Sequence, residues 1–247
     1  IHGYAFRGCR KLESVKIPSS VNSIGTLSGT TEYGYTFAGC LALKTVDLSE
    51  ASENLTFYGS YTFSETAIES IDLARFEMSE MPNSMFSLCV NLKEIKFPQG
   101  LIYMGDETFS GCTSIETVEI PASVKYLAGS STSDEYSTYT GQIFFGCTNL
   151  TSVRFLGNEV VAIGFGSFGN CTSLENLELP SSVKFIEGYT YYVNSKSQPC
   201  GAFMNTPIRE ITIPESVNVL DDYAFLGCKN LISINGGENI TTIGKQV

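Results

Sequence analysis

The amino-acid sequence predicts an α/β solenoid, a curved stack of repeats in which each repeat of about 23 residues adds one short parallel strand. The first observation behind this prediction is a segment over residues 108–124, TFSGCTSIETVEIPASV, whose pattern of apolar residues recurs along the whole chain. The second is that its leading phenylalanine recurs in nine copies, at Phe6, Phe37, Phe63, Phe86, Phe109, Phe144, Phe168, Phe203 and Phe225.

The interval between copies indicates the kind of solenoid. The shortest intervals are 22 to 24 residues, which lie in the range of leucine-rich repeats. We therefore predict a single leucine-rich-repeat domain over residues 1–247 with about nine repeats. Ile1 precedes Phe6 as Leu220 precedes Phe225, so the chain opens within a repeat, and it closes within one as well. Because solenoids need polar caps over their terminal rungs, we expect the chain to be a fragment of a longer protein.

Each copy contains one segment with the pattern of a short strand. In the first copy, apolar Val15 and Ile17 alternate with polar Ser14 and Lys16, which predicts a strand with one buried face. Pro18 ends this strand because proline cannot donate to a sheet. A second apolar pair follows, and the segment around Phe-x-Gly-Cys is too short for a long helix. We expect it to form short turns or helical turns opposite the strands.

Seven of the eight cysteines occupy one position of the repeat, which predicts a buried column of free thiols. The column consists of Cys9, Cys40, Cys89, Cys112, Cys147, Cys171 and Cys228. Cys200 lies outside it and is the thiol whose reactivity is worth testing. Two copies lack the Gly-Cys dipeptide and are one residue shorter, with Thr66 and Thr206 expected to replace the dipeptide in a tighter turn. The cysteines lack the clustered spacing that zinc requires.

Three insertions interrupt the repeat at one point, over residues 25–36, 128–143 and 187–202. Equivalent positions of a solenoid project from the same edge, so we expect the insertions to lie on one side. They hold seven of the thirteen tyrosines, set among Ser, Thr, Gly and Asn, a composition typical of recognition loops. The alternative is that the tyrosines pack the loops against the rungs beneath. The seven are Tyr33, Tyr35, Tyr136, Tyr139, Tyr189, Tyr191 and Tyr192.

Composition argues against several classes of function. The formal net charge is −11 and no run of Lys or Arg occurs, which disfavours nucleic acid and anionic membranes as partners. No apolar run is long enough to span a bilayer, so we expect no membrane insertion by this segment. The single histidine, His2, would have to serve any Ser-His-Asp or Cys-His arrangement. We therefore expect no enzyme, no catalytic residue, no metal and no cofactor.

The repeat resembles a known class of bacterial repeats. Its consensus is Ile-Gly-x-x-Ala-Phe-x-Gly-Cys-x-x-Leu-x-x-Val-x-Ile-Pro-x-Ser-Val-x-x-Ile, shown by YAFRGCRKLESVKIPSSVNSIG in the first copy and YAFLGCKNLISI in the ninth. In this the chain resembles the BspA-like, Treponema pallidum-type leucine-rich repeats. The resemblance implies an extracellular or cell-surface protein of a host-associated bacterium that adheres to host proteins or cells. The family carries no catalytic residues or ligand motif that could be transferred, and the three insertions depart from its pattern.

Two functions are compatible with these observations. The first is a non-catalytic extracellular module of a cell-surface protein, which binds a protein or glycan on host or neighbouring cells through its tyrosine-rich edge. The alternative is a structural spacer or scaffold that displays another domain, with insertions that only pack. The outward strand residues form a mixed polar face without an aromatic anchor, so the insertions are the better candidate for a binding site.

Overall fold

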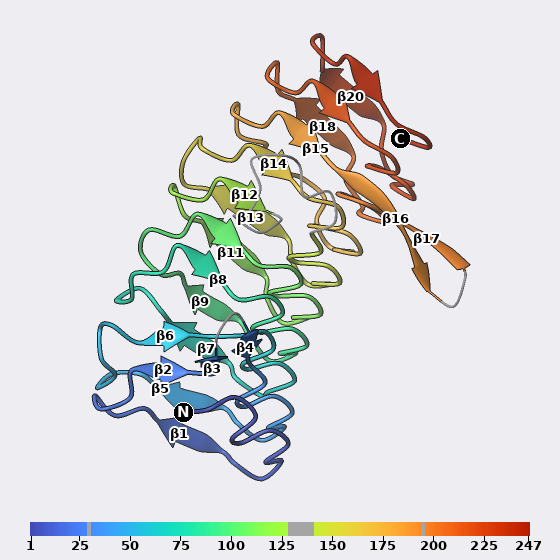
Figure 1. Ribbon diagram of the computed structural model, residues 1–247. Coiled ribbons are helices and arrows are strands. Elements are labelled where there is room, and N and C mark those ends of the chain that lie inside the picture. The colour runs from blue at the N-terminus through green and yellow to red at the C-terminus, as the bar shows by residue number, and fades with distance from the viewer. Residues whose placement is uncertain (29–30, 128–140, 194–195) are drawn as a thin grey trace.

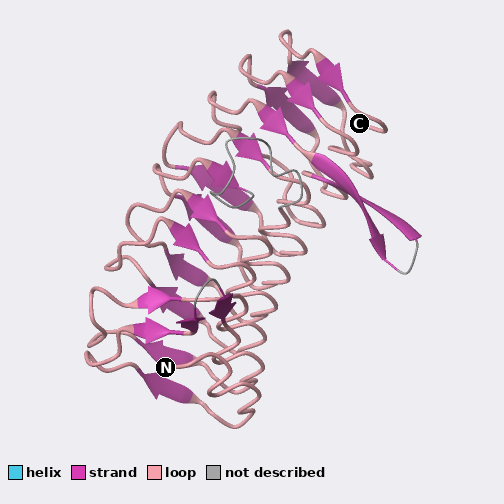
Figure 2. Ribbon diagram, viewed as in Figure 1, coloured by secondary structure: helices cyan, strands magenta, loops and turns pink. Residues whose placement is uncertain are grey.

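The computed structural model describes residues 1–28, 31–127, 141–193 and 196–247, which form a curved stack of rungs (Figure 1). Each rung passes through a first strand, a second strand of two residues and a turn segment. The strands of successive rungs pair in parallel, which confirms the predicted parallel-strand solenoid. The described residues contain no helix, so the side opposite the strands is built from turns (Figure 2).

The first strands coincide with the predicted Leu-x-x-Val-x-Ile-Pro segments. They pair two by two, and Val15 lies opposite Val46 in the first pair. This side is divided into short pairs rather than one sheet, and the copy at residues 174–180 has no assigned strand. The pairs are β1 (Ser14–Lys16) with β5 (Thr45–Asp47), β7 (Ser70–Asp72) with β9 (Glu94–Lys96), β11 (Thr117–Ile120) with β13 (Ser152–Phe155), and β18 (Glu210–Ile213) with β20 (Ser233–Gly236).

The second apolar pair of each copy forms a second sheet, which the sequence did not predict. Its strands are two residues long, and in all but the last the second residue is buried in the core. β2 (Ser23–Ile24) pairs with β6 (Thr56–Phe57). A continuous sheet then contains β8 (Glu80–Met81), β10 (Tyr103–Met104), β12 (Tyr126–Leu127), β14 (Ala162–Ile163), β15 (Phe185–Ile186), β19 (Val219–Leu220) and β21 (Thr242–Ile243).

Backbone hydrogen bonds also join the turn segments of successive rungs. Tyr4 N donates to Gly34 O at 2.9 Å, and Phe6 N donates to Thr36 O at 2.9 Å. Gly8, four residues after Tyr4, donates to the next rung in the same way. Tyr4 and Gly8 both have left-handed backbone conformations, with φ of 63° and 73°. The same pair of left-handed positions, four residues apart, recurs in the following rungs and lets each turn face its neighbour.

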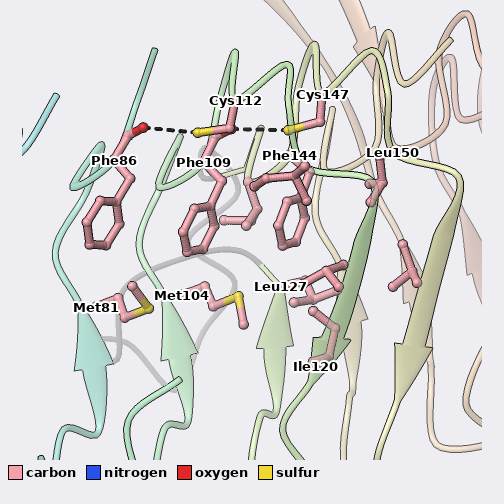
Figure 3. Packing of buried hydrophobic residues seen from close by; sticks show 14 of the residues in the cluster. Met81, Phe86, Met104, Phe109, Cys112, Ile120, Leu127, Phe144, Cys147 and Leu150 are labelled. Carbon is pink, nitrogen blue, oxygen red and sulfur yellow. Dashed lines mark hydrogen bonds between the residues drawn. The ribbon is translucent and has the colours of Figure 1, made fainter. Parts of the chain in front are cut away.

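A stack of phenylalanine rings fills the centre of the solenoid. The nine leading phenylalanines stack from Phe6 to Phe225 with ring centroids 5.2 to 6.1 Å apart. The seven rings from Phe37 to Phe203 are fully buried. Figure 3 shows Met81, Met104 and Leu127 of the second sheet lying against this stack.

The cysteine column lies beside the rings, and five of its seven thiols are buried as predicted, whereas Cys9 at one end is exposed and Cys228 at the other is partly buried. Cys112 Sγ donates to Phe86 O at 3.1 Å, and Cys147 Sγ donates to Phe109 O at 3.2 Å (Figure 3). Each thiol therefore satisfies a buried carbonyl of the preceding copy. All eight cysteines are free, and burial raises the pKa of Cys89 to about 11 and of Cys171 to about 12.

The two short copies differ from the prediction in detail. Thr66 takes the position of the cysteine alone, and its Oγ1 donates to Phe63 O at 2.8 Å. Glu65 takes the glycine position, with a left-handed φ of 57°. The missing residue therefore lies after this turn. The threonine hydroxyl bonds the phenylalanine carbonyl of its own copy, whereas the thiols bond that of the preceding copy.

The phenylalanine stack predicts a position-dependent loss of stability. We expect Phe109→Ala to lower the free energy of unfolding by about 3–5 kcal/mol, because it opens a cavity in a fully buried stack. Phe6→Ala, at a ring that is 37% exposed, should cost less than half as much. Urea denaturation followed by circular dichroism measures both. Equal losses would contradict the idea that the interior of the stack is the more tightly packed part.

Candidate functional site

Two of the three insertions contain antiparallel hairpins. β3 (Thr26–Ser28) pairs with β4 (Thr31–Tyr33), and β16 (Gly188–Val193) pairs with β17 (Lys196–Gly201). We call them the first and second hairpins. Figure 1 shows the second hairpin extending away from the stack of rungs. The third insertion lies largely outside the described residues.

The structure describes two of the seven predicted tyrosine side chains. Tyr136 and Tyr139 lie outside the described residues, and so do the side chains of Tyr33, Tyr191 and Tyr192. Tyr35 and Tyr189 are both partly buried but lie in different surroundings. The prediction that these seven residues bind a ligand can therefore be compared with the structure only at Tyr35 and Tyr189.

Tyr189 packs against the rung beneath the second hairpin. Its ring centroid lies 5.6 Å from that of Phe165, with the planes tilted by 48°. On the opposite strand Cys200 is fully buried, and Gln142 Nε2 donates to its Sγ at 3.5 Å. Burial raises the pKa of the Cys200 thiol, so this cysteine is not the accessible thiol that its sequence position suggested.

Tyr35 is the middle ring of an aromatic ladder. Its centroid lies 5.3 Å from that of Tyr4 and 4.7 Å from that of Tyr61, with the planes within 14° of parallel. The guanidinium carbon of Arg7 lies 4.9 Å from the Tyr35 centroid and 5.7 Å from the Tyr4 centroid, which is within cation–π range. We call Tyr4, Tyr35, Tyr61 and Arg7 the tyrosine ladder.

The repeat itself builds this ladder. All three tyrosines occupy the left-handed position two residues before the leading phenylalanine, with φ of 57° to 63°. Hydrogen bonds between turns hold successive rungs one ring spacing apart, so side chains at this position stack. Partial burial, together with the neighbouring rings of Tyr61 and Tyr4, raises the pKa of Tyr35. Sequence reasoning missed Tyr4 and Tyr61, although their recurring place before the phenylalanine was a usable signal.

On the outward face of the first strands, three ion pairs join neighbouring strands. In each of three strand pairs, a cation on one strand and an anion on the other occupy opposite register positions and form an ion pair. Exposed pairs of this kind contribute little to stability, but each holds one cation of this face next to an anion. The pairs are Lys16 with Asp47, Asp72 with Lys96, and Glu119 with Arg154.

The described residues offer little that catalysis could use. His2 Nδ1 lies 3.0 Å from Thr26 Oγ1 of the first hairpin, at an exposed position. Within the described ranges, no group of three or more His, Cys, Asp or Glu side chains could hold a metal ion. The described part of the chain also contains no helix that is long and apolar enough to cross a membrane.

Glu187 lies at the base of the second hairpin. Its backbone N donates to Ile163 O at 2.9 Å, and its carbonyl accepts from Ala202 N at 3.1 Å. The carboxyl is partly buried, and burial together with the nearby charge of Asp221 raises its pKa to about 7. The carboxyl therefore changes charge close to neutral pH, where the hairpin joins the stack.

Comparison with known proteins gives matches at the level of family and fold. A family model described as BspA type leucine rich repeat region matches the chain in six copies, over residues 1–138, 131–200 and 196–247. A search of curated proteins found no match. A leucine rich cell surface protein from Faecalibacterium prausnitzii has a similar fold, with 20% identity and a TM-score of 0.55. The match covers 96% of this chain but only 64% of that protein.

Two further solved structures match with lower TM-scores. The pneumococcal vaccine antigen PcpA is 21% identical, with a TM-score of 0.45 over 94% of this chain and 65% of that one. The Treponema pallidum leucine rich repeat protein is 21% identical, with a TM-score of 0.32 over 99% of this chain and 65% of that one. The likeness to the F. prausnitzii protein shows the fold alone. The present chain spans slightly less than two thirds of the length of each of these three proteins.

The raised pKa of Glu187 predicts that stability falls as pH rises. In the unfolded chain the carboxyl ionises above its ordinary pKa of 4.5, whereas in the folded state it stays neutral up to about pH 7. The stabilisation from the neutral form is complete below pH 4.5 and is lost as the pH rises through 7. We expect the free energy of unfolding to fall by on the order of 2 kcal/mol between pH 5 and pH 8 from this group.

Urea denaturation of the wild type and of Glu187→Gln at both pH values tests this expectation. In the variant, most of the fall in the free energy of unfolding between pH 5 and pH 8 should disappear, because glutamine carries no charge at either pH. Glu178→Gln, at an exposed carboxyl on the first-strand face, serves as the matched control and should behave as the wild type. An unchanged pH dependence in Glu187→Gln would contradict the assignment.

Proposed function

The chain belongs to the BspA-type leucine-rich repeat family, and from that premise we propose that it is a non-catalytic binding module of a bacterial cell-surface protein. In this proposal the module is extracellular and adheres to proteins or glycans on host or neighbouring cells through its tyrosine-rich edge. The observation that carries the proposal is the tyrosine ladder, in which stacked rings and a guanidinium lie at the surface beside the first hairpin.

Several observations support this proposal. Leucine-rich repeat families are generally non-catalytic binding scaffolds that mediate protein interactions, and the F. prausnitzii relative is described as a cell surface protein. Tyr and Arg are enriched among residues that dominate binding energy, because they combine large contact area with polar groups. Rings that are already stacked lose little conformational freedom when a partner binds.

A second candidate function is a structural spacer that displays another domain. The contact between Tyr189 and Phe165 favours it, because this tyrosine packs against its own rung. Under this alternative the hairpins only cover the edge of the stack, and the continuous column of phenylalanines provides stiffness. Removal of the hairpins and the ladder distinguishes the two functions.

The test uses variants that restore the regular repeat. Deleting residues 26–33, 128–139 and 189–200 leaves four residues between the second apolar pair and the next phenylalanine, as in the regular copy from Ile163 to Phe168. A second variant combines Tyr35→Ala with Tyr61→Ala. Both are compared with the wild type for binding to purified collagen, laminin and fibronectin and to intact epithelial cells, by surface plasmon resonance and flow cytometry.

We expect the wild type to bind at least one of these targets. Each variant should weaken that binding by at least 10-fold, since truncating interface hot spots costs about 2 kcal/mol or more. Tyr223→Ala is the matched control, because Tyr223 has the same left-handed position far from the ladder and should bind as the wild type. Binding that survives both variants would favour the spacer and overturn the proposed site.

A further inference from the structure

A groove of ≈ 410 Å³ lies beside the tyrosine ladder. It lies between two columns of residues with left-handed backbone conformations. Each rung contributes one residue to each column, and these two residues are four apart in sequence. On one side stand Tyr35 and Tyr61, and on the other stands Leu88. Gly8 and Gly39 leave space between the columns, because no side chain projects from them.

The two ends of the groove carry opposite charges. Arg7 and Arg10 lie on the first rung with exposed side chains, and neither forms an ion pair with a described carboxylate. Glu65 and Glu107 lie on the third and fifth rungs. Glu65 is exposed, while Glu107 accepts a hydrogen bond from Ser84 Oγ at 3.4 Å. A bound segment would therefore meet cations at one end and anions at the other.

Two exposed leucines line the groove between Arg7 and Glu107, on the rungs before and after that of Glu65. Leu88 is 50% exposed and Leu41 is 51% exposed, so both leave apolar surface open to a ligand. The ring faces of Tyr35 lie against Tyr4 and Tyr61, so they are not available to stack on a sugar ring. The groove therefore offers side-chain contacts and charges rather than a flat aromatic platform.

The length of the groove fits a short extended peptide. The ring spacings of 5.3 and 4.7 Å give the rise per rung, so the four steps from Arg7 to Glu107 span about 20 Å. An extended chain advances about 3.3 Å per residue, which corresponds to about six residues.

We propose that this groove binds an extended segment of a partner protein, about six residues long. The segment carries an acidic side chain at the end facing Arg7 and Arg10, and a basic side chain at the end facing Glu107. An apolar side chain between them contacts Leu88. This inference rests on the proposed function and adds the chemistry of the partner to it. The contact of Arg7 with the Tyr35 ring, at 4.9 Å from the ring centroid, holds its guanidinium in place for a carboxylate.

The test measures fluorescence anisotropy of labelled six-residue peptides with the 247-residue chain. One peptide has aspartate at one end, leucine in the middle and lysine at the other end, and a second has the reverse order. A control peptide carries serine at both charged positions. We expect one of the two charged peptides to bind at least 10-fold more tightly than the control peptide.

Two variants locate the binding in the groove. Arg7→Glu should weaken binding by at least 10-fold, and replacing the aspartate of the peptide with lysine should restore it to this variant. Gly39→Asn should also weaken binding, because its side chain fills the space between the columns. Asparagine is compatible with this left-handed position, since Asn170 and Asn205 occupy it in other rungs. Gly146→Asn, outside the groove, is the matched control.

The inference would be overturned if neither charged peptide bound. It would also be overturned if Gly39→Asn left peptide binding unchanged and the lysine-substituted peptide did not bind Arg7→Glu. The proposed function fails separately. If a matrix protein binds and Tyr35→Ala with Tyr61→Ala abolishes that binding, while Arg7→Glu and Gly39→Asn leave it unchanged, the module binds its partner outside the groove. If no target binds at all, the proposed function itself is wrong.

Discussion

Backbone hydrogen bonds between successive turns determine the spacing of every column in this molecule. In the first six turns three donors, separated by one residue, reach the carbonyls of the next rung, as Tyr4, Phe6 and Gly8 do in the first copy. The central donor carries the buried phenylalanine, so its ring falls on the ring of the next copy. The outer donors adopt left-handed conformations, which cost about 1–2 kcal/mol each for residues other than glycine and persist because the hydrogen bonds offset them.

The hydrogen bonds between turns fix the residue type at the phenylalanine position but allow different residue types at the left-handed positions. The phenylalanine position accepts one residue type in all nine copies, because the stack leaves no free space. The left-handed position two residues before the phenylalanine lies outside the ring stack, and it accepts Tyr35, Ser84, Glu107, Gln142 and Gly166 with similar backbone conformations. A solenoid of this kind can therefore change its surface chemistry rung by rung without altering its core, and the tyrosine ladder is one such choice.

The regular columns could be predicted from sequence, whereas the irregular parts could not. Phe109 and Cys112 recur at fixed spacing, and a residue repeated at every rung must stack on its own copies. The second sheet was missed because two-residue strands such as Tyr103–Met104 are too short to show a periodicity. The two hairpins could not be predicted because their strands do not show alternating apolar and polar residues, although these strands pair with each other. Tyr61 lies outside the insertions and so was not predicted, although it occupies the same repeat position as Tyr35, two residues before the leading phenylalanine.

The distribution of charge determines which side of the solenoid recognises a partner. The first-strand face pairs cations with anions at opposite register positions, as Lys96 does with Asp72. Arg7 lies instead over tyrosine rings, without a described carboxylate partner, on a chain whose net charge is −11. An extended anionic surface is repelled by such a chain as a whole, whereas a single acidic side chain can approach one local cation. The overall acidity thus adds selectivity to the turn edge, because it disfavours the partners that isolated arginines would otherwise attract.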